Sequence, residues 1–313
     1  MIHCVNLNAT QDHVFVLPTL GWGGVNRAVA TLSYPGGKGN NVARAVAALG
    51  GKVRLHAFSP AQECVQVRRF FKERKVVASL TAVPGSARPC LVILDGQRNE
   101  ETVVNSPSQL KVGPAALARL QAGLMKTVKA GDIVTFSGSV PEGLRGDSYQ
   151  SLIRAVVSLG GVALLDSSGE SLKLGVEAAP FIVKPNAEEL GVAFGVPTGT
   201  RDQVIRASKA LLRKGVRCVI VTLGAKGSVC VTAREALYAA PLPTPRGLLS
   251  PVGCGDAFLG GMARALDQGR DLQDCLRVAM ATAWANLSVP GAVFFDPKLA
   301  KAQVAWVKIS RLG

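Results

Sequence analysis

The segment from residue 114 to residue 222 alternates helical and strand patterns, and this alternation restricts the fold more than any other feature of the chain. We predict helices over 114–129, 147–159, 186–194 and 202–214, and strands over 133–136, 162–165, 181–183 and 216–222. Strands that alternate with helices form a parallel sheet covered by helices on both faces. The carboxyl ends of such strands lie at one edge, where α/β proteins bind ligands. The segment therefore predicts an α/β fold with a site at that edge.

The rest of the chain extends the same pattern. Before residue 114 we predict strands at 2–7 and 53–58, a glycine-rich turn that leads into a helix within 35–51, a helix at 61–75, and short β segments near 76–82, 90–94 and 101–104. After residue 222 we predict a hairpin of 227–231 and 236–240, then helices at 254–268, 272–288 and 297–309. The chain has 313 residues, of which 48% are hydrophobic, enough for a large core. Because no repeat or linker divides the sequence, we expect one domain over residues 1–313.

Composition narrows the classes of function. The seven cysteines are scattered and form no C-x-x-C pair, which favours a reduced cytoplasmic protein without a zinc site. The N-terminal residues do not have the pattern of a signal peptide, and the sequence contains no apolar run long enough for a membrane span. The net charge of +15 suggests either nucleic-acid binding or attraction of small phosphorylated ligands. Aromatic residues are 5% of the chain and are not interleaved with the basic ones, so we expect the second.

The stretch SPVGCGDAFLGG, residues 250–261, is the strongest candidate for a catalytic element. Its glycines allow successive backbone N–H groups to converge at the start of a helix, where the helix dipole also favours an anion. A carboxylate is a poor neighbour for an anion, so Asp256 is best explained as the group that accepts a proton from an attacking hydroxyl. The simpler alternative is a turn followed by an ordinary helix-capping aspartate.

Four more loops directly follow predicted strands, and together with GGKGNN at residues 36–41 they identify a family. The loops are FSGSVPEG (136–143), DSSGE (166–170), VKPNAEEL (183–190) and VTLGAKG (221–227). Neither a Walker P-loop nor a dinucleotide-binding glycine motif is present. In order and content, these segments resemble the phosphofructokinase B family of ribokinase-like sugar kinases over nearly the whole chain. Val25, Asn26, Arg27, Arg88 and Pro251 resemble the subgroup that contains tagatose-6-phosphate kinase and 1-phosphofructokinase.

The resemblance implies a fold, an activity and partners. The fold would be a ribokinase-like three-layer α/β sandwich with a mostly parallel central sheet and a small β lid from parts of 10–34 and 76–106. The activity would be transfer of the γ-phosphoryl group of ATP to a hydroxyl of a phosphorylated ketohexose, with Mg²⁺. We expect a homodimer through the lid, because a small sheet leaves exposed strand edges that pairing would cover. We expect no nucleic-acid or membrane partner.

The resemblance also assigns roles to particular residues. Asp256 would be the base, with the amides of Gly253, Cys254 and Gly255 as the anion hole. The sugar phosphate would be bound by Asp12, Arg27, Gly36, Gly37, Lys38, Gly39, Asn41 and Arg88. The nucleotide would contact Lys184, Asn186, Thr222, Gly224, Gly227 and Asn286, and Asn186 and Glu189 would hold Mg²⁺ through water. Simpler readings stay open: Asp12 as a turn residue, Asn41 as a helix cap, Asn186 and Glu189 as a cap with a solvent-facing acid, and each cation as surface charge.

Departures from the family pattern leave the substrate open. Ala9 stands where the family has proline, and Ser59, Pro60 and Ala61 stand where glycines are expected. Tagatose 6-phosphate, fructose 1-phosphate, fructose 6-phosphate, an unphosphorylated sugar or nucleoside, and a non-catalytic binding or regulatory role therefore remain alternatives. Cys254 is also unusual for the family. The helix dipole would favour its reactive thiolate, whereas the alternative is an inert cysteine buried between helix and sheet.

Overall fold

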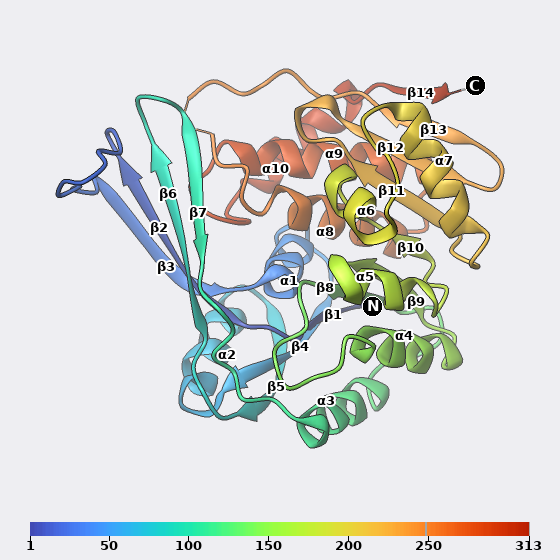
Figure 1. The fold of residues 1–313 in the computed structure, drawn as a ribbon, viewed down its shortest axis with the longest axis horizontal. Helices are drawn as coiled ribbons and strands as arrows, with labels where there is room; N and C mark the ends of the chain where they lie inside the picture. Colours follow the sequence, from blue (N-terminus) through green and yellow to red (C-terminus); the bar gives the residue numbers. More distant parts are fainter. Residues whose placement is uncertain (248, 313) are drawn as a thin grey trace.

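A long, mostly parallel sheet crosses the molecule and carries helices on both faces (Figure 1). The computed structural model describes residues 1–247 and 249–312. In spatial order the sheet contains β14 (Ile309–Leu312), β13 (Ala236–Ala239), β12 (Ser228–Thr232), β11 (Cys218–Thr222), β10 (Ile182–Val183), β9 (Val162–Asp166), β8 (Ile133–Ser137), β1 (Ile2–Asn6), β4 (Val53–Pro60) and β5 (Val76–Val83). Neighbouring strands run parallel from β5 to β11 and antiparallel from β11 to β14. The predicted α/β class is confirmed.

Two helical layers bury the two faces of the sheet. One layer contains α3 (Pro114–Met125), α4 (Ser148–Ser158), α5 (Gly169–Val176), α6 (Ala187–Phe194) and α7 (Arg201–Leu212). The other contains α1 (Lys38–Ala48), α2 (Cys64–Glu73), α8 (Cys254–Asp267) and α9 (Leu272–Leu287), with α10 (Pro297–Gln303) packed on α9. Side chains alternate between the layers: in β11, Val219 and Val221 join the first core and Cys218 and Ile220 the second. No helix within the described ranges is long and apolar enough to cross a membrane.

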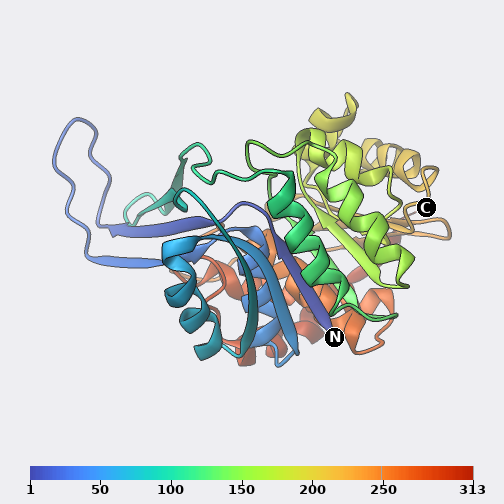
Figure 2. The ribbon, with the colours of Figure 1, turned by 90° about the horizontal axis from the view of Figure 1, so that it is seen from below.

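A second sheet of four strands leans away from the main body as a lid (Figure 1). Its order is β3 (Ala30–Gly36), β2 (Thr10–Leu17), β6 (Arg88–Asp95) and β7 (Glu100–Asn105). Figure 2 shows the connection between β2 and β3 reaching far out from the body. The lid was predicted to use parts of 76–106; it takes β6 and β7 from this range, whereas residues 76–83 form β5, which pairs with β4 at the edge of the main sheet.

The end of the last helix and one additional helix also differ from prediction. The last helix was predicted to reach residue 309, but α10 ends at Gln303 and is followed by a 3₁₀ turn, Val304–Trp306, and by β14. β14 pairs antiparallel with β13, so an available sheet edge overrides the helical pattern of this segment. Helix α5 was not predicted, and short 3₁₀ turns at Ala61–Glu63 and Gly224–Lys226 complete the regular structure of the described residues.

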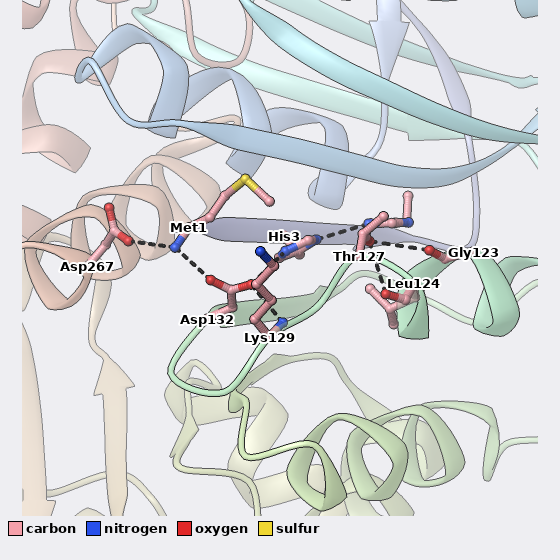
Figure 3. A network of polar contacts seen from close by, with 9 residues as sticks. Met1, His3, Gly123, Leu124, Thr127, Lys129, Asp132 and Asp267 are labelled. Carbon is pink, nitrogen blue, oxygen red and sulfur yellow. Dashed lines mark hydrogen bonds and ion pairs between the residues drawn. The ribbon is translucent and has the colours of Figure 1, made fainter.

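A buried polar network joins the start of the chain to the neighbouring strands (Figure 3). The Nδ1 of His3 lies 3.1 Å from the Nε2 of His56, and the Nε2 of His3 lies 3.3 Å from Asp132. The backbone ammonium of Met1 lies 2.8 Å from Asp132 and 3.2 Å from Asp267. Burial lowers the pKa of His3 and lowers that of His56 to about 3, so both imidazoles are neutral at physiological pH.

Candidate active site

The start of α8 forms an anion cradle. Gly253 has a φ of 78°, and a Cβ on it would lie 2.5 Å from the Cβ of Ala292, so the turn requires glycine. The N–H groups of Gly253, Gly255 and Asp256 have no acceptor among residues 1–247 and 249–312, whereas the Cys254 N–H donates to the carbonyl of Pro251 at 3.1 Å. Of the predicted anion hole, the Cys254 amide is thus already engaged, whereas the Asp256 amide, which was not predicted, lacks an acceptor among these residues in the same way as those of Gly253 and Gly255.

Asp256 lies in the first turn of α8 and is 5% exposed. Asn41, on α1, donates a hydrogen bond of 2.7 Å from Nδ2 to the Asp256 carboxylate, and Arg44 donates one of 2.6 Å to the Asn41 Oδ1. Burial raises the pKa of Asp256 to about 7, an effect that Asp166 strengthens and Lys38 opposes. A carboxylate with a pKa near neutrality is well suited to accept a proton at physiological pH.

Two lysines and two acids form a charged cluster beside this carboxylate. The Lys38 Nζ lies 3.5 Å from Asp166 and 3.6 Å from Glu189, and the Lys184 Nζ lies 3.1 Å from Asp166. The Asp166 carboxylate raises the pKa of Lys38 and so keeps its ammonium charged. A Cβ on Gly255 would lie 3.6 Å from the Lys184 Nζ, so this ammonium lies at the cradle itself. Backbone amides and the Lys184 ammonium therefore lie together at the start of α8, an arrangement that favours an anion.

A cavity of about 250 Å³ opens next to the cluster, between the main sheet and the base of the lid. It is lined by Asn8, Thr10, Gly37, Lys38, Arg88, Gly138, Ser139, Ser168 and Glu189. Arg88 donates a hydrogen bond of 2.8 Å from Nη1 to the carbonyl of Ser106, which fixes its guanidinium at the cavity wall. Two cations and several hydroxyl and amide groups make the cavity suitable for a small, polar, anionic ligand.

Comparison with known proteins identifies the family to which this chain belongs. The model of the pfkB family carbohydrate kinases matches residues 8–299. The chain belongs to the pfkB family. The 1-phosphofructokinase of Rhodobacter capsulatus is 33% identical over 312 residues, covering 99% of this chain and 98% of the relative. The 1-phosphofructokinase of Xanthomonas campestris is 33% identical over 310 residues, covering 97% and 96%. This pfkB-family member is a phosphotransferase with an alcohol group as acceptor.

Solved structures confirm the ribokinase-like fold. Phosphofructokinase-2 from Escherichia coli, in complex with potassium, superposes with a TM-score of 0.88 at 24% identity and covers 97% of this chain and 98% of its own. Ribokinase from Arabidopsis thaliana, complexed with ribose and ATP, superposes with a TM-score of 0.73 at 22% identity and covers 97% and 98%. The predicted fold and family of this pfkB-family kinase are therefore both confirmed.

The glycines predicted to approach the sugar have three different tasks in this kinase. Gly37, with a φ of 105°, borders the cavity. A Cβ on Gly36 would lie 2.1 Å from the Asp12 carboxylate, and a Cβ on Gly39 would lie 2.5 Å from the Val5 carbonyl. Gly36 thus makes room for Asp12 and Gly39 for β1, so both glycines are also required by packing within the chain.

Asp12 and Asn41 are also placed differently from their simpler readings. Asp12 lies in strand β2, not in a turn, and its carboxylate accepts a hydrogen bond of 2.6 Å from Thr10. Burial raises the pKa of Asp12. The helix cap of α1 is Gly37, so Asn41 lies one turn inside the helix, where it orients Asp256. The sequence did not reveal this positioning role.

Arg27 does not join the other predicted phosphate ligands within one chain. It is exposed and lies in the connection between β2 and β3, the segment that reaches out from the body in Figure 2. Lys38 and Arg88 line the cavity together, so two of the three predicted cations converge.

At the predicted nucleotide end, some residues stand at the surface of the site and others support it from behind. Asn186 forms a β-bridge with Thr222, and Asn186 and Glu189 cap α6 reciprocally through hydrogen bonds of 2.7 and 2.8 Å. The helix cap of the alternative reading is therefore present, but Glu189 is not the solvent-facing acid of that reading, because it also faces Lys38 and lines the cavity. Asn286 is fully buried. Its Nδ2 donates a hydrogen bond to the carbonyl of Val252, and its Oδ1 accepts one from the N–H of Val293. Asn286 therefore stabilises the cradle loop and presents no exposed group to a nucleotide.

The two glycines of the β11–β12 turn differ as well. Gly224 has a φ of 59° and open space around it, whereas a Cβ on Gly227 would lie 2.2 Å from the carbonyl of Ala239. Gly224 is thus placed where another molecule can approach the backbone. Gly227 is needed for packing against β13.

The residues present fit a magnesium ion and a phosphate chain. Among the described residues, the buried carboxylate of Asp166 is paired only with the ammonium groups of Lys38 and Lys184, and Glu189 lies across Lys38 from it. Magnesium prefers such oxygen ligands and retains several waters. No group of three or more His, Cys, Asp or Glu side chains in the described part of the chain is arranged around one point, so water would complete the coordination. Asp166 was missed as a site residue, although an acid directly after a buried strand was a usable signal.

The Cys254 thiol is not activated, contrary to the hypothesis of a reactive thiolate. Its Sγ lies 3.4 Å from the carbonyl of Ala283 and 3.4 Å from the amide of Asn286. Burial raises the pKa of this thiol to about 12, because the cost of desolvating a thiolate exceeds the effect of the helix dipole. Cys254 fills space between α8 and α9, which agrees with the alternative prediction of an inert buried cysteine.

A contact between lid and cradle loop was not visible in the sequence. The Glu101 carboxylate, on β7, accepts hydrogen bonds from the Ser250 hydroxyl at 2.9 Å and from the Val252 N–H at 3.1 Å. Asn99 accepts another from the Leu249 N–H at 2.8 Å. The lid therefore holds the loop that leads into the cradle.

Proposed function

We propose that this pfkB-family kinase transfers the γ-phosphoryl group of ATP to a hydroxyl of fructose 1-phosphate. One observation carries the proposal: Lys38 and Arg88 line a single cavity, and Lys38 also belongs to the cluster around Asp256. Fixed cations in the sugar cavity suit a substrate that already has a phosphate. The relatives named 1-phosphofructokinase favour fructose 1-phosphate over fructose 6-phosphate and tagatose 6-phosphate.

Each part of the site has a task in this reaction. Asp256 accepts the proton of the attacking hydroxyl, and Asn41 holds its carboxylate in position. The amides of Gly253, Gly255 and Asp256, with the ammonium of Lys184, stabilise the charge on the transferred group. The lid excludes water, so that the sugar hydroxyl and not water attacks.

The nucleotide and its ion use the opposite side of the cluster. ATP supplies the phosphoryl group, and Lys184, Asn186, Thr222 and Gly224 are proposed to bind it beside the cradle. Asp166 and Glu189 are proposed to hold Mg²⁺ through water. Asn286 would act only indirectly, by fixing the loop.

We also propose a homodimer formed through the lid. The strand order leaves β3 and β7 as edges of the lid sheet, and exposed strand edges favour pairing with another chain. Large apolar side chains are exposed on the same sheet and its outer connection: Trp22 and Val25 at 84%, Val104 at 49% and Val103 at 39%. Sedimentation of the wild type and of a Trp22→Ser, Val25→Ser variant tests this: a monomeric wild type would refute the dimer.

The test of the activity is a coupled assay of ADP release. The panel contains fructose 1-phosphate, fructose 6-phosphate, tagatose 6-phosphate, fructose, ribose and adenosine, and we expect the highest kcat/KM with fructose 1-phosphate. A higher kcat/KM with another phosphorylated sugar would show that this sugar, and not fructose 1-phosphate, is the substrate. A higher kcat/KM with an unphosphorylated compound would refute the proposed role of Lys38 and Arg88. Arg88→Ala should raise the KM of the sugar phosphate far more than that of ATP. If none of the acceptors on the panel gives ADP release, a non-catalytic role would be favoured.

A further inference from the structure

A second cavity, of about 300 Å³, lies on the α1 side of the molecule and shares no lining residue with the first. It is formed by the ends of α1 and α2 and by the segment after α9. Its charged walls are Arg44, Glu73, Arg74 and Lys75, and its apolar walls are Ala47, Ala48, Val293, Phe294 and Phe295. Three cations face one carboxylate, so the cavity has a positive balance next to an apolar surface.

Arg44 is the unusual member of this wall. It is 3% exposed, and its Cζ lies 4.6 Å from the ring centroids of both Tyr34 and Phe294. Its Nη2 donates to Asn41, but its Nε and Nη1 have no hydrogen-bond partner within the described residues. A buried guanidinium with unused donors is costly, and a nearby anion would relieve that cost.

A second guanidinium adds to the positive charge. The Cζ of Arg74 lies 3.7 Å from the ring centroid of Phe70, and that of Arg44 lies 5.8 Å from the same centroid. Burial lowers the pKa of Arg44 to about 10, and repulsion from Arg74 acts in the same direction. Glu73 is turned to Arg69 at 3.1 Å and lies 3.8 Å from Arg74, so it compensates only part of this charge.

The backbone of the cavity wall is strained in two places. Lys75 and Val293 have φ values of 59° and 60°, a conformation that is unfavourable for side chains other than glycine and most unfavourable for a β-branched residue such as valine. The Val293 N–H donates to Asn286, and the preceding Ala292 packs against Gly253 of the cradle. Strain of this kind is found at binding and switch regions. Here the strained segment supports the phosphoryl-transfer loop from behind.

We propose that this cavity binds a phosphate monoester of a small metabolite, and that the bound anion acts on the catalytic carboxylate through Arg44 and Asn41. Planar guanidinium groups bind phosphate oxygens in pairs, and the apolar walls accommodate a short carbon skeleton. The hydrogen bonds Arg44 to Asn41 and Asn41 to Asp256 give a direct connection of two contacts. An anion that draws the Arg44 charge towards the cavity weakens the first contact and loosens Asp256.

Binding is tested with the phosphoryl-transfer cavity silenced. In a Lys38→Met, Arg88→Met background, calorimetric titration with glycerol 3-phosphate should show one site. Adding Arg74→Gln and Lys75→Asn should weaken this binding at least about tenfold, since each lost charge-assisted contact to phosphate is strong. Asparagine tolerates the positive φ of position 75. The matched control, Arg68→Gln with Lys72→Gln, removes two exposed charges from α2, which directly precedes Arg74, outside the cavity, and should bind normally. No binding in the background, or equal loss in both variants, would overturn the site.

Coupling is tested in the enzyme with intact Lys38 and Arg88, at saturating sugar phosphate and ATP. Glycerol 3-phosphate should lower kcat about fivefold, the lower range of measured couplings between sites, and should have no effect on kcat in the Arg74→Gln, Lys75→Asn variant. Inhibition that excess sugar phosphate abolishes would show binding at the substrate cavity only and would overturn the coupling. The titration does not depend on which sugar is phosphorylated, so failure of the proposed function and failure of this site are separate results.

Discussion

Replacing Asp256 by Asn should stabilise the protein while it removes most of the activity. Burial raises the pKa of this carboxyl from 3.8 to about 7, so the folded protein holds its proton more strongly than the unfolded chain does. Ionised Asp256 therefore costs folding free energy, and the cost grows as the pH rises from the unfolded pKa to the folded one. A shift of this size corresponds to about 4 kcal/mol above pH 7 and to about 2 kcal/mol at pH 5. The amide introduced by Asp256→Asn has no charge, and its oxygen can still accept the hydrogen bond from Asn41.

The assay is urea unfolding of both proteins at pH 5 and pH 8, together with the rate of ADP release. We expect the variant to be the more stable at both values, with the larger difference at pH 8, and kcat to fall by about two to four orders of magnitude. In the wild type, kcat/KM should fall as the pH drops below about 7, because the base becomes protonated.

Asp132, a buried acid whose pKa is lowered instead of raised, provides the control. Contacts with the Met1 ammonium, opposed by burial, leave the pKa of Asp132 below its usual range. Asp132→Asn should therefore destabilise the protein, and more so above pH 4 than below it. A stability of Asp256→Asn equal to or lower than that of the wild type at pH 8 would refute the interpretation of Asp256 as a desolvated base.

Three more predictions address other contacts. Since burial lowers the pKa of His56 to about 3, the contribution of His56 to stability should be complete above pH 6.5 and fall by up to about 1.4 kcal/mol per pH unit as the pH falls towards 3; in urea unfolding, the stability of the wild type relative to His56→Gln should fall over this range, and a constant difference would exclude a role of His56. Glu101→Ala should lower kcat/KM about tenfold or more, because it releases Ser250 and Val252. Glu100→Ala, at the exposed neighbouring position, should have little effect. Equal kcat/KM in the two variants would show that the lid contact is not needed. Cys254 in the native protein should resist thiol reagents, and mild peroxide should affect wild type and Cys254→Ala equally; selective protection by the substitution would contradict the raised pKa of this thiol.

The main sheet was predictable from the sequence, because its signals are local. Strands such as β8, β9 and β11 are short apolar runs between helical segments, and a buried parallel strand needs little else. The lid was predictable only in part. The segment 76–83 reads like the lid strands, and only its pairing with β4, which depends on distant residues, places it in the main sheet.

The candidate site divides in the same way. Lys38, Lys184, Glu189 and Asp256 belong to short motifs whose spacing fixes a helix start or a strand end, and the structure brings them together. Burial at a residue depends instead on what packs over it from elsewhere in the chain. For this reason the sequence did not reveal that Asn286 is enclosed, and it could not decide between a reactive and a buried Cys254 thiol or between a ligand and an exposed surface charge at Arg27.

The beginning of α1 shows how one short motif serves several distant parts of the site. Lys38, Asn41 and Arg44 are three residues apart, so they follow one side of the helix. Lys38 lines the cavity beside Asp166 and Glu189, and Asn41 donates a hydrogen bond to Asp256, 215 positions away. Arg44 is enclosed by aromatic rings and lines the cavity at the ends of α1 and α2. Because the three side chains share one rigid helix, a displacement of α1 moves all of them together. Substitutions at Gly39, where a Cβ would meet the Val5 carbonyl at 2.5 Å, should therefore disturb substrate binding and the orientation of Asp256 at once, although Gly39 itself does not line the cavity.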